Sequence, residues 1–81
     1  MSSDEHKLQQ DEVDRLAKAF QRNIRKHRKA QHMTQEKVAE LANISPRFYQ
    51  KIEQGRSIPT VPFAYLIARA LNVTVDDLLE G

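Results

Sequence analysis

The chain contains no cysteine, so it can form neither a disulfide framework nor a thiolate metal site. It has only two glycines, which excludes a glycine-rich loop for phosphates. No apolar run approaches the roughly 20 residues that span a bilayer. The first six residues also lack the basic start and apolar centre of a signal peptide. We therefore expect a cytoplasmic protein that is not bound to a membrane.

Patterns typical of catalysis and metal binding are also missing. The three histidines, His6, His27 and His32, do not have the spacing of metal ligands. No combination of nucleophile, base and orienting group can be assembled from the sequence. We expect no enzymatic activity, no metal and no cofactor.

The chain does carry many charges, and they are unevenly distributed. Its 81 residues suffice for one small domain. Residues 1–14 have a net charge of −4, residues 15–56 of +8 and residues 57–81 of −2. The basic middle is where an anionic partner would bind, although a run of charges is more often only a solvated helix face.

Helical periodicity of the apolar residues predicts an all-α architecture with five helices. The predicted helices run from Asp11 to Ala30, from the Thr34 cap to Asn43, from Pro46 to about Gln54, from the Thr60 cap to Asn72, and from Val75 to Leu79. Residues 1–10 form a polar extension that we expect to be disordered or to fray onto the first helix.

An apolar face can be assigned to each of the four longer helices. In the first helix a basic, solvated side lies opposite this face, so a membrane-surface or calmodulin-like target helix is an alternative that we consider less well supported than core packing. The expected faces are Val13, Leu16, Ala17, Phe20 and Ile24; Val38, Leu41 and Ala42; Tyr49 and Ile52; and Val61, Ala64, Tyr65, Ile67, Ala68 and Leu71.

The stretch from Ile44 to Gly55 specifies a turn and a helix together. Ser45 is a good N-cap, Pro46 suits the first helical position, and Gly55 ends the helix. Ile44 and Tyr49 have the spacing of a hydrophobic staple. Further along the chain, Thr74 and Asp77 have the spacing of a capping box at the start of the last helix.

Two short helices joined by a tight turn form a unit whose second helix can lie in the major groove of DNA. On the predicted third helix, Arg47, Gln50, Lys51 and Gln54 lie opposite the buried side. Arginine and lysine can bind guanine O6 and N7, and glutamine can bind adenine N6 and N7. This outer side is therefore suited to read base edges.

These features resemble the phage-repressor and Cro-like family of helix-turn-helix proteins, also called the xenobiotic-response-element family. The resemblance lies in MTQEKVAELANISPRFYQKIEQGRSIPT and LIARALNVTVDDLLEG and covers the chain from about Phe20 to its C-terminus. It implies a compact lambda-repressor-like domain over residues 11–81, with the helix-turn-helix unit at residues 34–54. The positions that match the family's spacing are Gln35, Ala39, Asn43, Ser45, Ile52, Glu53 and Gly55.

The resemblance also implies roles for individual residues. Pro46, Arg47 and Lys51 match base-reading positions, while Gln50 joins them because it lies on the same side of the helix. Phe48 either packs inside the protein or contacts a thymine methyl or a sugar.

Four residues are expected to contact the DNA backbone rather than the bases. Gln35 and Ser45 match phosphate-binding positions of the family, and Arg56 matches a position that commonly contacts the backbone. Lys37 is a weaker addition. In contrast, Arg28 and Glu53 match a structural ion pair of the family, so we expect Arg28 not to bind DNA.

The sequence departs from the family pattern at several positions. Glycine is usual where His32, Asn43 and Asn72 stand, and His27 and Tyr49 replace an aliphatic and a smaller β-branched residue. Val13 and Leu16 continue the apolar face of the first helix upstream of the resemblance. We expect these two residues to cover the last helix or a partner subunit.

The expected function is that of a repressor-like, sequence-specific transcription regulator that binds double-stranded DNA as a homodimer on a pseudo-palindromic site. An antitoxin with a toxin or regulator as its protein partner, or a restriction-modification controller, would use the same fold. A protein-interaction adaptor that does not bind DNA is the alternative from a different class.

Overall fold

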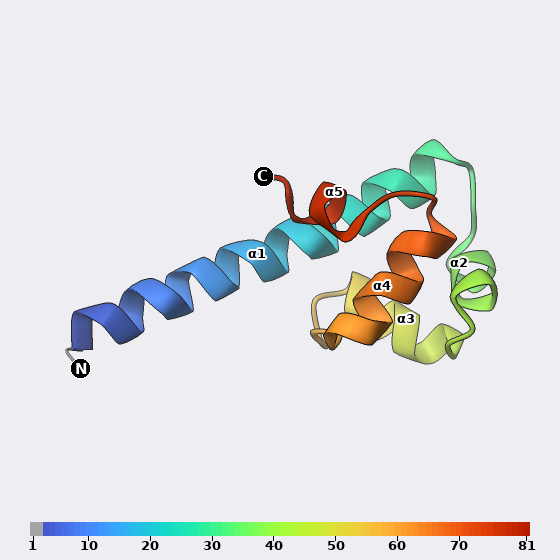
Figure 1. Ribbon diagram of the computed structural model, residues 1–81. Coiled ribbons are helices and arrows are strands. Elements are labelled where there is room, and N and C mark those ends of the chain that lie inside the picture. The colour runs from blue at the N-terminus through green and yellow to red at the C-terminus, as the bar shows by residue number, and fades with distance from the viewer. Residues whose placement is uncertain (1–2) are drawn as a thin grey trace.

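The computed structural model describes residues 3–81, with side chains from Leu8 onward. It consists of five α-helices, and no strand occurs in the described range, so the predicted all-α architecture is confirmed. None of the helices in that range is long and apolar enough to cross a membrane. The helices shown in Figure 1 are α1 (Ser3–Ala30), α2 (Gln35–Ala42), α3 (Pro46–Glu53), α4 (Val61–Ala70) and α5 (Val75–Leu79).

Helix α1 begins at Ser3, eight residues before the predicted start at Asp11. The earlier residues contain no proline or glycine to stop a helix, and glutamate, leucine and glutamine all favour helix. Residues 1–2 of the predicted polar extension lie outside the described range, and the domain boundary at residue 11 stays a prediction. In Figure 1 the N-terminal half of α1 extends away from the other helices.

The core lies where the C-terminal half of α1 meets the other four helices. It includes Phe20 and Ile24 of α1, Tyr49 of α3 and Leu78 of α5. Asn23 of α1 is also buried, and its amide donates to Leu78 O at 2.9 Å and to Glu80 O at 2.7 Å. These two hydrogen bonds satisfy backbone carbonyls at the end of α5 and hold this short helix against α1.

Four residues predicted to face the core are exposed instead: Val13, Leu41, Val61 and Tyr65. On α2 the buried stripe consists of Val38, Ala39 and Ala42, and Leu41 lies about 100° away from it. Tyr65 is displaced from the buried stripe of α4 in the same way, and Val61 precedes the first buried residue of that helix, Ala64.

The turns explain how the chain tolerates its departures from the family pattern. His32, Asn43 and Asn72 all adopt left-handed backbone conformations, with φ of 57°, 58° and 59°. Gly55 has φ of 76°, and a Cβ atom there would lie 2.8 Å from Gln21 Oε1. Gln21 in turn donates from Nε2 to Glu53 O at 3.1 Å. Glycine at this position therefore allows Gln21 to cap the end of α3.

Candidate nucleic-acid interface

The turn between α2 and α3 is defined by caps on both helices. The Thr34 hydroxyl accepts from Lys37 N at 3.0 Å at the start of α2, and Asn43 ends that helix in the left-handed conformation. The Ser45 hydroxyl then accepts from Phe48 N, also at 3.0 Å, and Pro46 occupies the first turn. The predicted start of α3 is confirmed, and its last helical residue, Glu53, is one residue earlier than predicted.

Helix α3 has one buried side and one accessible side. Tyr49, Ile52 and Glu53 are buried. Pro46 and Arg47 are exposed, and Gln50 and Lys51 are half-buried. Among the described residues, no hydrogen bond or ion pair involves the side chains of Arg47, Gln50 or Lys51. The amide and the two cationic groups are thus free to bind a ligand.

Phe48 lies between these two sides and packs on α4. Its ring meets that of Phe63 in an edge-to-face arrangement, with centroids 5.2 Å apart and an interplanar angle of 76°. Of the two roles considered for Phe48, packing is therefore present. Its contact with a thymine methyl or a sugar stays a prediction. Phe63 was not expected to take part, and no local pattern in the sequence indicates this contact.

The predicted ion pair is present beneath the interface. Arg28 Nη2 lies 2.6 Å from Glu53 Oε1, and Arg28 Nε lies 2.9 Å from Oε2, so the guanidinium binds the carboxylate with two parallel hydrogen bonds. Arg28 also donates from Nη1 to Met33 O at 3.0 Å. This pair joins the end of α1, the α1–α2 turn and the end of α3.

The Glu53 carboxylate also receives a hydrogen bond from Gln35, whose Nε2 lies 3.2 Å from Glu53 Oε1. Burial alone would raise the pKa of Glu53, but the hydrogen bonds from Arg28 and Gln35 and the nearby Tyr49 hydroxyl outweigh it and lower the pKa. That hydroxyl lies close to the carboxylate but has no partner in hydrogen-bond geometry among the described residues. Burial raises the pKa of Tyr49 itself, so its ring stays neutral.

The remaining residues proposed for backbone contact lie at the ends of the short helices. Ser45, Arg56 and Lys37 are exposed, and Gln35 is half-buried at the start of α2. Lys37 Nζ lies 3.9 Å from Glu40 Oε2, a weak pair between two exposed side chains. These positions flank α3 rather than cover its outer side.

The arrangement of a capped α2, a tight turn and an α3 with a free polar side defines a helix-turn-helix protein. Residues 24–78 match the helix-turn-helix family model HTH_3. The match spans more than half of the chain, so the chain belongs to this family, as the sequence predicted. Helix-turn-helix domains are DNA-binding units.

Two similar proteins agree with this assignment. The chain is 42% identical over 49 residues to an uncharacterized HTH-type transcriptional regulator of Methanothermobacter thermautotrophicus, across 60% of this chain and 71% of that protein. Its fold resembles that of the restriction-modification controller protein C.AhdI from Aeromonas hydrophila, with a TM-score of 0.73. That likeness covers 82% of this chain and 97% of the controller at 23% identity, and it concerns the fold alone.

Proposed function

We propose that this protein is a sequence-specific transcription regulator of the repressor type that binds double-stranded DNA. The observation that carries the proposal is the outer side of α3, where Arg47, Gln50 and Lys51 are accessible and unpaired among the described residues. The proposal is supported by the similarity of this chain to an HTH-type transcriptional regulator, with 42% identity over 49 residues. A cytoplasmic, non-enzymatic protein fits the same proposal.

In this proposal α3 enters the major groove, and its outer residues contact base edges. Arg47 and Lys51 supply donors for guanine, Gln50 binds adenine, and Pro46 and Phe48 provide apolar contacts near the bases. Gln35 and Ser45 bind phosphates beside the amino ends of α2 and α3, with Arg56 and Lys37 as further cationic contacts. Because these contacts release counterions, affinity falls as salt rises.

We further propose that the protein acts as a homodimer on a pseudo-palindromic site. Two α3 helices related by a two-fold axis would read half-sites about one helical turn, or 34 Å, apart. Control of a restriction-modification system is one candidate role, and the fold shared with the controller C.AhdI is compatible with it. An antitoxin that pairs with a toxin is a second candidate role, because such a protein would bind DNA through the same helix-turn-helix unit.

Selection of bound sequences from a random DNA pool tests the proposal, because it reveals the site, its symmetry and the spacing of half-sites together. We expect an enriched pseudo-palindrome whose binding weakens steeply with salt in a gel shift. Enrichment of no sequence over competitor DNA would refute the proposal and favour a protein-interaction adaptor.

Two substitutions separate base contacts from backbone contacts. Arg47→Ala should cost about 1–3 kcal/mol of binding free energy and relax the preference at one base pair. Gln35→Ala should weaken binding to all sequences alike. Arg69→Ala removes an exposed arginine from the far end of α4 and should bind like the parent. If Arg47→Ala also bound like the parent, the assignment of α3 would be wrong.

A further inference from the structure

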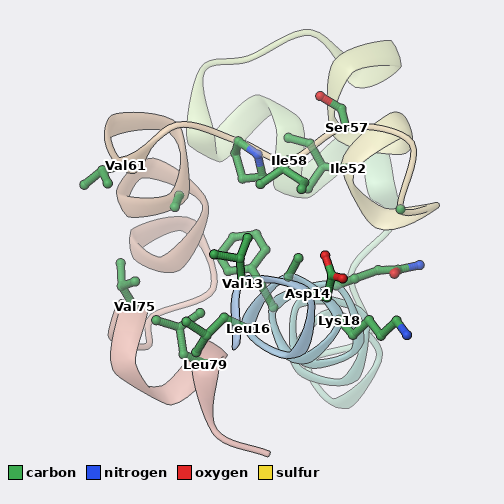
Figure 2. Close-up of a pocket in the computed structure, with 16 residues that line it drawn as sticks. Val13, Asp14, Leu16, Lys18, Ile52, Ser57, Ile58, Val61, Val75 and Leu79 are labelled. Carbon is green, nitrogen blue, oxygen red and sulfur yellow. The ribbon is translucent and has the colours of Figure 1, made fainter. Parts of the chain in front are cut away.

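A second surface, unrelated to the outer side of α3, is an apolar groove with a volume of about 430 Å³. Figure 2 shows it between α1 on one side and the segment that joins α3 to α4 on the other, with α5 closing one end. Its apolar lining includes Val13, Leu16, Ile58, Val61, Val75 and Leu79.

The rim of this groove exposes large aliphatic side chains. Val13 is 50% exposed, Ile58 is 70% exposed and Val61 is 80% exposed. All three line the groove: Val13 comes from α1, and Ile58 and Val61 come from the stretch where the α3–α4 connection enters α4. Clustered apolar residues of this kind mark interaction surfaces more often than single exposed ones do.

Charge along α1 indicates which partner fits. Residues 3–14 contain five acidic residues and one lysine, whereas residues 15–30 contain seven basic residues and no acidic one. Within α1 itself this distribution is favourable, because the acidic residues lie near the positive N-terminal end of the helix dipole and the basic residues near its negative C-terminal end. It also makes α1 complementary to a second α1 that runs in the opposite direction, because each acidic half then lies beside a basic half.

We propose that the apolar groove is the contact surface between two copies of this chain, with their α1 helices packed antiparallel across a two-fold axis. Such an interface is self-complementary, because Val13 and Leu16 of each copy enter the groove of the other. Ile58 and Val61 cover the incoming helix from the side. This inference rests on the proposed homodimer and specifies where its interface lies.

The position of the groove is compatible with DNA binding by both copies. It reaches α3 only at Ile52, which belongs to the buried side of that helix. Arg47 and Lys51 lie on the opposite side and do not line the groove. Pairing of two copies through the groove would therefore leave the outer side of each α3 free.

Sedimentation equilibrium without DNA tests the interface. We expect the parent to form dimers, and we expect Val13→Asp and Ile58→Asp each to raise the dimer dissociation constant about tenfold or more, since a charge would enter an apolar contact. Both positions are at least half-exposed in one copy, so neither change places a charge in the core. Leu41→Asp, at a 45% exposed leucine on α2 away from the groove, is the matched control and should dimerise like the parent.

Cysteine cross-linking tests the antiparallel direction, and the cysteine-free chain provides a clean background. Ala17 lies at the middle of the α1 residues that line the groove, so two copies of Ala17→Cys should meet near the axis and form a disulfide on mild oxidation. Gln10→Cys should remain uncross-linked, because antiparallel pairing separates the two equivalent positions. Equal cross-linking at both positions would indicate parallel helices and overturn the inference.

Two further outcomes would also overturn it. The parent could be monomeric at all concentrations tested, or the aspartate variants could dimerise as well as the parent. A monomeric parent would also contradict the proposed homodimer. Neither result decides whether the protein binds DNA in a sequence-specific way, which the selection experiment measures separately. Conversely, the parent could form dimers that Val13→Asp disrupts and yet select no DNA sequence. That result would support the interface and refute the proposed function.

Discussion

At the scale of single residues, the least typical feature is the buried charge of Glu53. Its side chain is only 4% exposed, yet it remains ionised because Arg28 donates to both of its oxygens and Gln35 donates to one of them. A buried carboxylate without such donors is costly. The same carboxylate that stabilises the domain also holds Gln35, a residue proposed to contact DNA phosphate, in position.

Removal of the Arg28 side chain should destabilise the fold by leaving this carboxylate without its main partner. Arg28→Ala leaves the Glu53 carboxylate buried without its main partner, so we expect the free energy of unfolding to fall by about 3–5 kcal/mol in urea denaturation. Arg22→Ala, at an exposed position on the same helix, should change it by no more than about 0.5 kcal/mol. Similar losses in both variants would mean that the ion pair contributes little.

The lowered pKa of Glu53 predicts a pH dependence of stability. Because the folded pKa lies below the ordinary value of 4.5, ionised Glu53 stabilises the fold fully above about pH 4.5. That contribution is lost as the pH falls through the folded pKa. We expect Glu53→Gln to be less stable than the parent at pH 7, and the gap to narrow between pH 4.5 and 3. A gap that stays constant from pH 6 to 3 would contradict this assignment.

At the scale of helices, α3 and α4 begin in chemically different ways. Ser45 accepts a hydrogen bond from Phe48 N, whereas the side chain of Thr60 makes no capping hydrogen bond. Both helices carry proline in the first turn. The start of the proposed recognition helix is thus fixed more firmly than the start of the helix behind it.

Removal of the two cap side chains should show this difference. Ser45→Ala should lower the free energy of unfolding by about 1 kcal/mol, because Phe48 N loses its acceptor. Thr60→Ala should cost clearly less, since no capping hydrogen bond is lost. Urea denaturation in the absence of DNA compares the two variants, and an equal or larger loss in Thr60→Ala would show that the Ser45 hydrogen bond is not decisive.

At the scale of the whole molecule, the shape is set by a single long helix. The principal dimensions are 45 × 21 × 19 Å, and the long axis reflects the part of α1 that extends beyond the bundle. Ala19 is the first core residue along the described chain. The turns of α1 before it contribute little to the core of one copy.

A truncated chain tests this division and the predicted boundary at residue 11. A chain that starts at Asp11 retains every core residue that the structure describes, and it also keeps Val13 in the apolar groove. We expect its free energy of unfolding to lie within about 1 kcal/mol of that of the parent at equal protein concentration. A loss of several kcal/mol would place the preceding residues inside the folded unit.

Much of the fold could be predicted because its determinants are local. The caps at Thr34 and Ser45, the end of α3 near Gly55 and the capping box of Thr74 and Asp77 are all present as expected. Each depends on residues within one helical turn. The pairing of Arg28 with Glu53 is not local and was expected only because of the family resemblance.

The sequence by itself therefore determined the presence of five helices, the caps at Thr34, Ser45 and Thr74, and the polar side of α3. Tertiary structure alone decided that Leu41, Val61 and Tyr65 are exposed. It also decided that Gln35 donates to Glu53 and that Phe48 packs on Phe63. An apolar groove beside α1 is likewise a result of packing. The physical reason is that helical periodicity specifies which residues share a face. Only packing decides which part of that face meets another helix and which part is left to solvent or to a partner.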